Sequence, residues 1–426
     1  MNNLQKYLSQ YKLDNLISAL SNISKELYNK DDFREYIGLY ENRGSFRFKV
    51  HTTLLTAWGV TDIIYHAIIS GNDAKGRTPD KYDIGWIFYI YAGFTNSQAK
   101  LYVNERGKTE LFYGLSQKQF WYQRKLMIIE QINRNIELLK YIPTQINSPI
   151  PIEEIILEKV GVSFDAVIKI LIMLYGRCSE SIDFSILTVD DSLLRLDSCF
   201  TQQNIKRVVD YFTGDYTAIR NSALGENFFY TKPFIRTDLG KIIAVNHFIV
   251  SRKCTDAVYW IIRNYYEELR RQDFTNEFGR YFEKYFGDML QHYLEADRFE
   301  RLDEDEREKM ADWAIYTTNY IVFIEQKSSL ASLTTKREYP DAVSLERFFS
   351  NFVKAFQQLD NAERKIQDKV QGRKVVKIAL HYEDLYIQSL IKEDILKSKN
   401  ELSNINNFFF AGIDYFMASA ALGLGF

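Results

Sequence analysis

Apolar residues recur at three- and four-residue steps through most of the first half of the chain. This spacing places them on one side of a helix, so we expect segment 1–225 to be largely helical. The most regular stretches are 4–27, 111–142 and 152–175. Pro149 and Pro151 separate the last two, because proline interrupts a helix.

The pattern changes near residue 225. Segment 228–235 is aromatic and β-rich, and segment 241–250 is an apolar run after a turn at 238–240, so we expect a hairpin there. Helical spacing then returns over 257–269. We therefore predict two domains: an α-helical domain over 1–225, with a sensing, regulatory or partner-binding role, and a second domain over 226–426.

The second domain has an informative order of elements. After a charged loop at 303–309, two short strands are joined by Thr318 and Asn319, and a long helix separates them from a final strand. The expected elements are a helix at 275–294, strands at 313–317 and 320–324, a helix at 343–371 and a strand at 374–381. This order predicts an α/β domain with a small mixed sheet flanked by helices.

Two apolar segments outside this core bear on partners and membranes. Segment 84–94 is eleven residues long, well below the roughly 20 needed to cross a bilayer, so no membrane association is expected. Segment 408–426 is nearly apolar apart from Asp414, and we expect a buried terminal helix or a contact with a second copy or a protein partner. The helical domain is the other candidate surface for such a partner.

Composition excludes several classes of protein. The 426 residues are 46% hydrophobic and 26% charged, which fits folded globular domains. A formal net charge of −2 lacks the positive excess of proteins that coat nucleic acid, so any such contact must occur through a local cleft. The N-terminus carries no secretory signal pattern and the three cysteines form no CxxC pair, so a reducing cytoplasm is expected.

The hairpin brings three charged residues together. Glu325 and Lys327 lie two apart on one strand, so their side chains share a face while Gln326 points to the other. With Thr318 and Asn319 as a two-residue turn, Asp312 stands directly opposite Glu325, at a Cβ separation of about 4.5–5.5 Å.

Two carboxylates at this spacing repel unless a proton or a cation lies between them. A divalent metal such as Mg²⁺, which prefers carboxylate, water and phosphate oxygens, removes the conflict. Lys327, beside Glu325, would then orient a water and balance charge on a phosphate. The structural alternative is an edge strand that carries Glu and Lys as protection against aggregation.

The setting of this cluster is specific within the chain. Of three Asp/Glu-x-Lys triplets, at 73–75, 363–365 and 325–327, only the last ends an apolar strand that has an acidic residue at its hairpin mate. The segment resembles the active site of the PD-(D/E)XK, or restriction-endonuclease-like, nuclease superfamily. Ala311 stands where some members have a proline, and the resemblance covers about residues 270 to 385, roughly a quarter of the chain.

The resemblance implies hydrolysis of phosphodiester bonds that depends on Mg²⁺ or Mn²⁺, with DNA as the expected substrate. It also implies metal ligation by Asp312, Glu325 and the backbone carbonyl of Gln326. Members often add a glutamate from the preceding helix, for which Glu283 is the candidate; a plain glutamate at the edge of an apolar face is the alternative.

Members also often place a polar residue from the long helix at the site. Gln358, with Gln357 and Lys354 nearby, is the candidate here, against the alternative of a solvated helix face.

Three functions stay open. The first is an active metal-dependent nuclease, endonuclease or exonuclease, whose fusion to a helical domain resembles effectors of anti-phage defence. The second is a catalytically inactive nuclease-like module that binds nucleic acid or scaffolds a complex. The third is a phosphoesterase acting on a small nucleotide, against which stands a basic run that favours a polymer: Arg364, Lys365, Lys369, Arg373 and Lys374.

Overall fold

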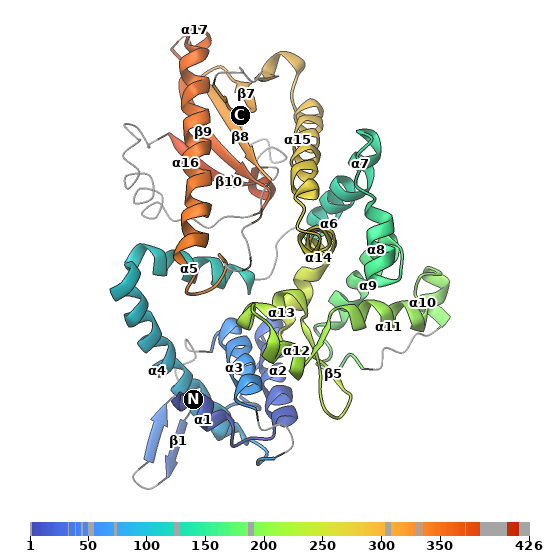
Figure 1. Cartoon of the computed structure of the whole chain (residues 1–426), viewed down its shortest axis with the longest axis vertical. Coiled ribbons are helices and arrows are strands. Elements are labelled where there is room, and N and C mark those ends of the chain that lie inside the picture. Colours follow the sequence, from blue (N-terminus) through green and yellow to red (C-terminus); the bar gives the residue numbers. More distant parts are fainter. Residues whose placement is uncertain are drawn as a thin grey trace. The chain divides into compact units, whose positions relative to one another are not determined.

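The computed structural model divides the chain into two compact units, each described here by itself (Figure 1). The helical unit comprises Met1–Gly107, Lys118–Ile128 and Pro151–Ile262, and the sheet unit comprises Lys108–Gln117, Ile129–Ile150 and Arg263–Phe426. The residues that the structure describes are 2–32, 34–38, 40–43, 46–49, 55–71, 75–122, 128–185, 191–302, 308–328, 330, 333, 335–370, 372–383 and 407–416.

The helical unit is built mainly from short and medium helices, as the periodicity predicted. Its helices are α1 (Asn3–Leu8), α2 (Leu13–Asn29), α3 (Ala57–Ser70), α4 (Lys81–Arg106), α8 (Ile152–Val160), α9 (Phe164–Arg177), α10 (Asp191–Leu196), α11 (Gln202–Tyr211), α12 (Tyr216–Asn221), α13 (Phe228–Thr231) and α14 (His247–Glu268), the last up to Ile262. Its strands are β1 (Tyr40–Arg43), β2 (Phe46–Lys49), β3 (Thr213–Asp215), β4 (Phe234–Arg236) and β5 (Ile242–Ala244).

The predicted helix over 152–175 is interrupted near its middle. The stretch 152–175 is two helices because Gly161 adopts φ +79 and ends α8, and the Ser163 side chain then accepts a hydrogen bond from the Ala166 amide at the start of α9. A Cβ at Gly161 would also approach the Arg207 side chain to 3.3 Å.

In the part of the chain described, no helix combines the length and the apolar character required to cross a membrane.

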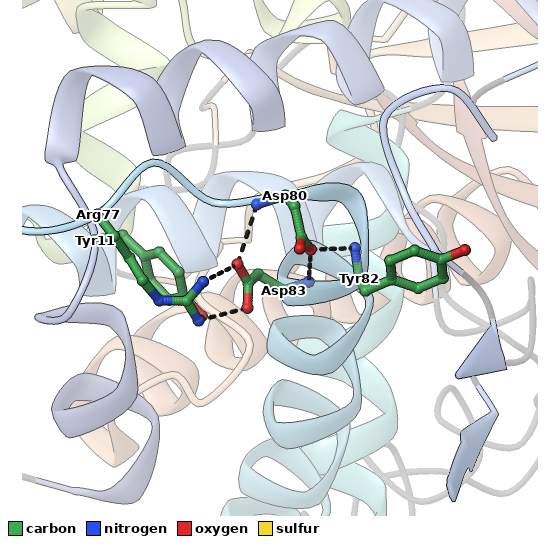
Figure 2. A network of polar contacts seen from close by, with 5 residues as sticks. All are labelled: Tyr11, Arg77, Asp80, Tyr82 and Asp83. Carbon is green, nitrogen blue, oxygen red and sulfur yellow. Dashed lines mark hydrogen bonds and ion pairs between the residues drawn. The ribbon is translucent and has the colours of Figure 1, made fainter. Parts of the chain in front are cut away.

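A polar network fastens the start of α4 to the segment between α1 and α2 (Figure 2). Asp80 caps α4 by accepting from the amides of Tyr82 and Asp83, and the Asp83 carboxylate accepts from the Asp80 amide in return. The same carboxylate binds the Arg77 guanidinium through two hydrogen bonds, of 2.5 and 2.6 Å. Arg77 also donates to the Tyr11 hydroxyl at 3.0 Å, so this arginine links the start of α4 to the segment between α1 and α2.

The expected domain boundary near residue 225 differs from the division between the units. Strands β4 and β5 pair as the expected hairpin, but the first strand is much shorter than the expected 228–235, because Phe228–Thr231 forms helix α13 and β4 covers only Phe234–Arg236. Strand β4 also pairs in parallel with β3, so the helical unit contains a three-stranded sheet. The expected strand over 241–250 ends at Ala244, because Asn246 accepts from the Phe248 amide and starts α14. The helical unit therefore extends to Ile262.

The sheet unit combines a five-stranded mixed sheet with helices. Its elements are α5 (Lys108–Trp121, of which Lys108–Gln117 belongs to this unit), α6 (Ile128–Ile136), a π-helical turn (Glu137–Tyr141), α7 (Ile142–Gln145), α15 (Asp273–Tyr293), β6 (Phe299–Arg301), β7 (Trp313–Tyr316), β8 (Tyr320–Lys327), α16 (Ala342–Lys365), α17 (Gln367–Val370), β9 (Lys374–His381) and β10 (Phe408–Gly412).

The strand order is β10-β9-β8-β7-β6, with antiparallel pairing from β6 to β8 and parallel pairing from β8 to β10. The hairpin has the predicted register, since Trp313 pairs with Ile324 and Thr318-Asn319 is the two-residue turn. Strand β8 runs three residues beyond the predicted end, to Lys327, and β9 has the predicted bounds. Strand β6 was not predicted.

Helices cover both faces of this sheet (Figure 1). On one face, Phe323 of β8 and Ala379 of β9 pack with Phe356 and Leu359 of α16 in one apolar cluster. On the other face, α15 packs Phe286 against Trp313 of β7. Helix α16 thus connects β8 to its parallel neighbour β9 and lies over the face on which Glu325 and Lys327 project.

The expectation of a helix over the apolar C-terminal segment is wrong for residues 408–412. These residues form β10, which pairs with β9, and Phe408 is fully buried against Phe356. The apolar character of this strand is therefore explained by its own sheet. Residues 417–426 of the same prediction lie outside the described residues.

Segment 129–150 is part of the sheet unit although it precedes the sheet by more than a hundred residues. Arg134 forms an ion pair with Asp414, which follows β10, and Gln131 donates to the same carboxylate at 2.7 Å. Asn135 accepts from the Tyr382 hydroxyl beyond β9. These buried contacts hold the ends of β9 and β10 in place.

Candidate active site

The sheet register places Asp312, Glu325 and Lys327 at one end of the hairpin. Asp312 immediately precedes β7, and its amide donates to the Ile324 carbonyl at 3.0 Å, one residue out of the register that pairs Trp313 with Ile324. Asp312 and Glu325 lie beyond the paired residues of the hairpin, so their predicted direct opposition stays a prediction, but both line one pocket. Lys327 ends β8 two residues further on.

Each of the three charged groups has a defined partner. The Asp312 carboxylate accepts a hydrogen bond of 2.6 Å from the backbone N–H of Gln326. The Lys327 ammonium lies 2.6 Å from Glu325 Oε1 and 3.0 Å from Gln358 Oε1. Gln358, on α16, is the residue that the sequence proposed for this position, and its amide nitrogen reaches the Met310 carbonyl at 3.4 Å.

Burial makes both carboxyl groups unusually weak acids. Removal from water and, to a smaller extent, the neighbouring Asp312 together raise the pKa of Glu325 to about 8, against the opposing effect of Lys327. Burial likewise raises the pKa of Asp312 to about 6, although the hydrogen bond from Gln326 counteracts it. Glu325 is only 3% exposed, and its Oε2 atom is buried without a hydrogen-bond partner.

An open pocket of about 550 Å³ gives access to this cluster. Its polar walls come from the hairpin, from the segment before it and from the middle of α16. The lining residues are Lys309, Asp312, Glu325, Lys327, Lys354, Gln357, Gln358 and Asn361. Asp312, Glu325, Lys327 and the three α16 residues named from the sequence therefore face one cavity.

Gln326 joins the site through its backbone, while its side chain points to the other face of the sheet. The side-chain amide accepts from Trp313 Nε1 at 2.7 Å and donates to the Phe282 carbonyl of α15 at 3.1 Å. Its backbone N–H donates to Asp312, and because the N–H and C=O of one strand residue point to the same side, its carbonyl also faces the Asp312 edge.

Glu283 does not line this pocket. It forms an ion pair of 2.5 Å with Arg301 and lines a separate pocket of about 420 Å³ between α15, Arg301 and Trp313. The ion pair holds Glu283 on the α15 side of the sheet, so it influences Asp312 only through its charge, which adds to the dominant effect of burial on the pKa of Asp312.

Sequence reasoning missed His381, Lys309 and Asn361. His381 pairs with Lys327 across the β8–β9 ladder, and burial, with a smaller effect of Lys327, lowers its pKa to about 3. The period of two in β9 puts His381 on the face of Ala379 and Lys377, and this signal could have identified it. Lys309 and Asn361 are joined by a hydrogen bond of 3.0 Å between two elements distant in sequence, which periodicity cannot reveal.

The oxygen atoms of this site are of the kind that a divalent cation such as Mg²⁺ binds, but few protein side chains are available as ligands. Glu325 Oε2, a buried carboxyl oxygen without a hydrogen-bond partner, can become a ligand beside a second carboxylate once Glu325 loses its proton. Within the described ranges, no three His, Cys, Asp or Glu side chains are grouped to hold a metal. A cation here would therefore bind two carboxylates, with the Gln326 carbonyl as the third protein donor.

Comparison with known proteins gives no relative: no family model matches the chain, and no curated protein or solved structure is significantly similar to it.

Proposed function

We propose that the chain is a metal-dependent nuclease that hydrolyses phosphodiester bonds of DNA, with the sheet unit as a restriction-endonuclease-like core. The observation that carries this proposal is the carboxylate pair. Asp312 and Glu325 line one pocket at the end of the hairpin, Glu325 is buried and Asp312 is half-buried, and Glu325 Oε2 has no hydrogen-bond partner. A protein gains nothing in stability from such a pair, because each charge raises the cost of the other.

The arrangement of elements supports the same proposal. A helix, an antiparallel hairpin, a crossover helix and a parallel strand follow one another as α15, β7–β8, α16 and β9. This is the order that the sequence comparison with PD-(D/E)XK nucleases led us to expect. The charged residues stand at the end of the hairpin, where the pocket opens between the sheet and α16.

Asp312, Glu325 and the Gln326 carbonyl would hold Mg²⁺ or Mn²⁺. When bound, the ion supplies a Lewis acid that lowers the pKa of a water and neutralises charge on the phosphate. Binding requires both carboxyl groups to be ionised. With a pKa of about 6 Asp312 is mostly ionised near neutral pH, whereas Glu325, with a pKa of about 8, keeps its proton there in the metal-free protein.

Lys327 would position the attacking water and stabilise negative charge that develops on the phosphate oxygens. Its ammonium is held by Glu325 and Gln358, so its direction is fixed before substrate arrives. Gln358 would act through Lys327 and is a positioning residue.

A non-catalytic nucleic-acid-binding module is the second candidate. The observation in its favour is the ion pair of 2.6 Å between Lys327 and Glu325, which neutralises one carboxylate without a metal. A structural ion pair of this kind would need no cation.

Incubation of the full chain with supercoiled and linear DNA in Mg²⁺, in Mn²⁺ and in excess chelator separates the two functions. We expect cleavage with either ion, none in chelator, and none by the Glu325→Gln variant. Undiminished cleavage in chelator would refute the metal mechanism. Binding of DNA without any cleavage in either ion would favour the non-catalytic module.

A further inference from the structure

The pocket-lining face of α16 continues in both directions as a polar, positively charged stripe. Residues 7, 11, 14 and 18 positions apart share one side of a helix. From Arg347, these steps reach Lys354, Gln358, Asn361 and Lys365. We call these five residues, with the adjacent Arg364, the α16 stripe.

The α16 stripe contains no acidic residue, and its cations face solvent. Arg347, Lys354, Arg364 and Lys365 are all exposed. Among the residues that the structure describes, no carboxylate forms an ion pair with Arg347, Lys354 or Arg364. The charges of Arg347, Lys354 and Arg364 are therefore available to a polyanion.

Two acidic residues in the C-terminal half of α16, Asp360 and Glu363, lie on another side of the helix and are neutralised by an ion pair with one lysine. Glu363 lies 2.5 Å from the Lys377 ammonium, and Asp360 also forms an ion pair with it. Lys377 is a buried residue of β9, only 3% exposed. This arrangement neutralises the acidic residues beside the C-terminal half of the α16 stripe, while Glu346, next to Arg347, is exposed.

The stripe extends beyond the pocket on both sides. Arg347 precedes Lys354 by seven residues, or about 10 Å at 1.5 Å per residue, and Lys365 follows it by eleven, or about 16 Å. One strand of duplex DNA advances about 3.4 Å per phosphate, so the stripe matches about eight phosphates, with the pocket between its ends. A strand that ended in the pocket would have phosphates on one side of it only and would leave the cations on the other side of the pocket without a contact.

We propose that the α16 stripe binds the sugar–phosphate backbone of DNA across the open pocket, so that cleavage occurs within a strand and not at its end. The backbone contact rests on the charges of the stripe alone, whereas the internal cleavage rests on the proposed nuclease function. The contact is independent of base identity, because cations on phosphates fix position and carry no sequence information.

Binding as a function of salt concentration tests the contact without cleavage. Full-length protein with Glu325→Gln is titrated with a short duplex by fluorescence anisotropy over a range of salt concentrations. The logarithm of the binding constant falls as the logarithm of the salt concentration rises. Each lost phosphate contact makes this negative slope shallower by about 0.9. We therefore expect a reduction of about 1.8 for Arg347→Gln/Arg364→Gln and about 0.9 for Arg347→Gln alone.

The control is Arg271→Gln/Arg280→Gln, which removes the same charge as the double variant from exposed positions at and just before α15, on the other face of the sheet. It should leave the slope unchanged. Equal slopes for the parent, both stripe variants and the control would overturn the backbone contact. A slope change that appears with RNA and not with DNA would overturn the choice of DNA.

Closed circular DNA, which has no ends, tests the position of cleavage with the parent protein and Mg²⁺. Nicking or linearisation of the circle is expected. Degradation of linear DNA alone would overturn internal cleavage while leaving the nuclease proposal intact. If no DNA is cut but the salt slopes change as expected, the nuclease proposal fails and the α16 stripe stands as a binding surface.

Discussion

The carboxyl groups of Asp312 and Glu325 and the ammonium group of Lys327 lie in one pocket, but their expected roles differ. The two carboxyl groups are candidate metal ligands, whereas Lys327 contributes a charge that a bound cation would oppose. Substitutions that nearly preserve shape can therefore separate metal binding from the chemical step.

We expect Asp312→Asn and Glu325→Gln to weaken metal binding in calorimetric titration and to abolish cleavage, with partial recovery in excess Mn²⁺. Lys327→Ala should bind metal at least as tightly as the parent, because a positive neighbour is removed. Its cleavage rate should still fall by about 10² or more. A Lys327→Ala variant that cleaves at the parental rate would assign this lysine a purely structural role.

The raised pKa of Glu325 makes stability depend on pH in a direction that can be checked. A free glutamate has a pKa of about 4.3, so the folded state, with a value of about 8, binds the proton more tightly. The stabilising contribution is complete below about pH 4 and is lost as pH rises toward about 8. Asp312, with a pKa of about 6, contributes in the same direction.

In chelator, Glu325→Gln should therefore melt at a higher temperature than the parent at about pH 9 and close to it at about pH 4. The exposed Glu154→Gln change in α8 is the control and should follow the parent at both values. Added Mg²⁺ should stabilise the parent more as pH rises through this range, because binding displaces the protons. Identical melting curves for parent and Glu325→Gln at high pH would show that Glu325 is not the weak acid described here.

At the scale of elements, the sequence pattern predicted strands best where the two paired strands are neighbours along the chain. The Thr318-Asn319 turn fixes the β7–β8 register, so the presence of Asp312 and Glu325 together at the end of the hairpin could be predicted from the sequence. Strand β6 is three residues long, and β10 pairs with β9 across a long intervening segment. Neither leaves a periodic signal, and an apolar run such as 408–412 fits a buried helix as well as a buried strand. The position of Glu283 was missed because its partner, Arg301, belongs to β6.

Two glycines of α15 provide a test of how closely this helix packs on the sheet. A Cβ at Gly287 would lie 3.0 Å from the Trp313 ring, whereas one at Gly279 would meet only Ser328 Oγ, at 3.4 Å. We expect Gly287→Val to destabilise the protein by about 1–3 kcal/mol through overpacking. Because Trp313 binds Gln326, cleavage should fall as well.

Gly279→Ala, on the same helix, should be neutral or stabilise by about 0.5–1 kcal/mol, since alanine favours the helix and fits the space. Urea unfolding of the two variants measures both effects. Equal stability of Gly287→Val and the parent would mean that α15 does not press on Trp313.

At the scale of the whole molecule, the simple division at residue 225 does not describe the sheet unit. Tyr113 of α5 is fully buried against Phe348 and Phe349 of α16, and Arg134 is buried in its ion pair with Asp414. These contacts join residues more than two hundred positions apart, which no sequence pattern within one segment indicates.

A fragment of residues 226–426 should therefore be poorly folded, because it leaves Asp414 buried without Arg134 and exposes the apolar surface that Tyr113 covers. A fragment of residues 108–426 retains these contacts and should show more helical circular dichroism and greater resistance to proteolysis. A cooperative unfolding transition for 226–426 equal to that of the full chain would contradict this expectation.

The chain passes from one unit to the other five times, after residues 107, 117, 128, 150 and 262. During synthesis, segments that precede residue 151 must wait for β9 and β10 before the sheet unit can close around them. The ion pair with Asp414 cannot form until residue 414 has left the ribosome. If the chain is the nuclease proposed here, it would stay inactive during synthesis up to that point, and the sheet unit could not be transferred to another protein as a single contiguous cassette.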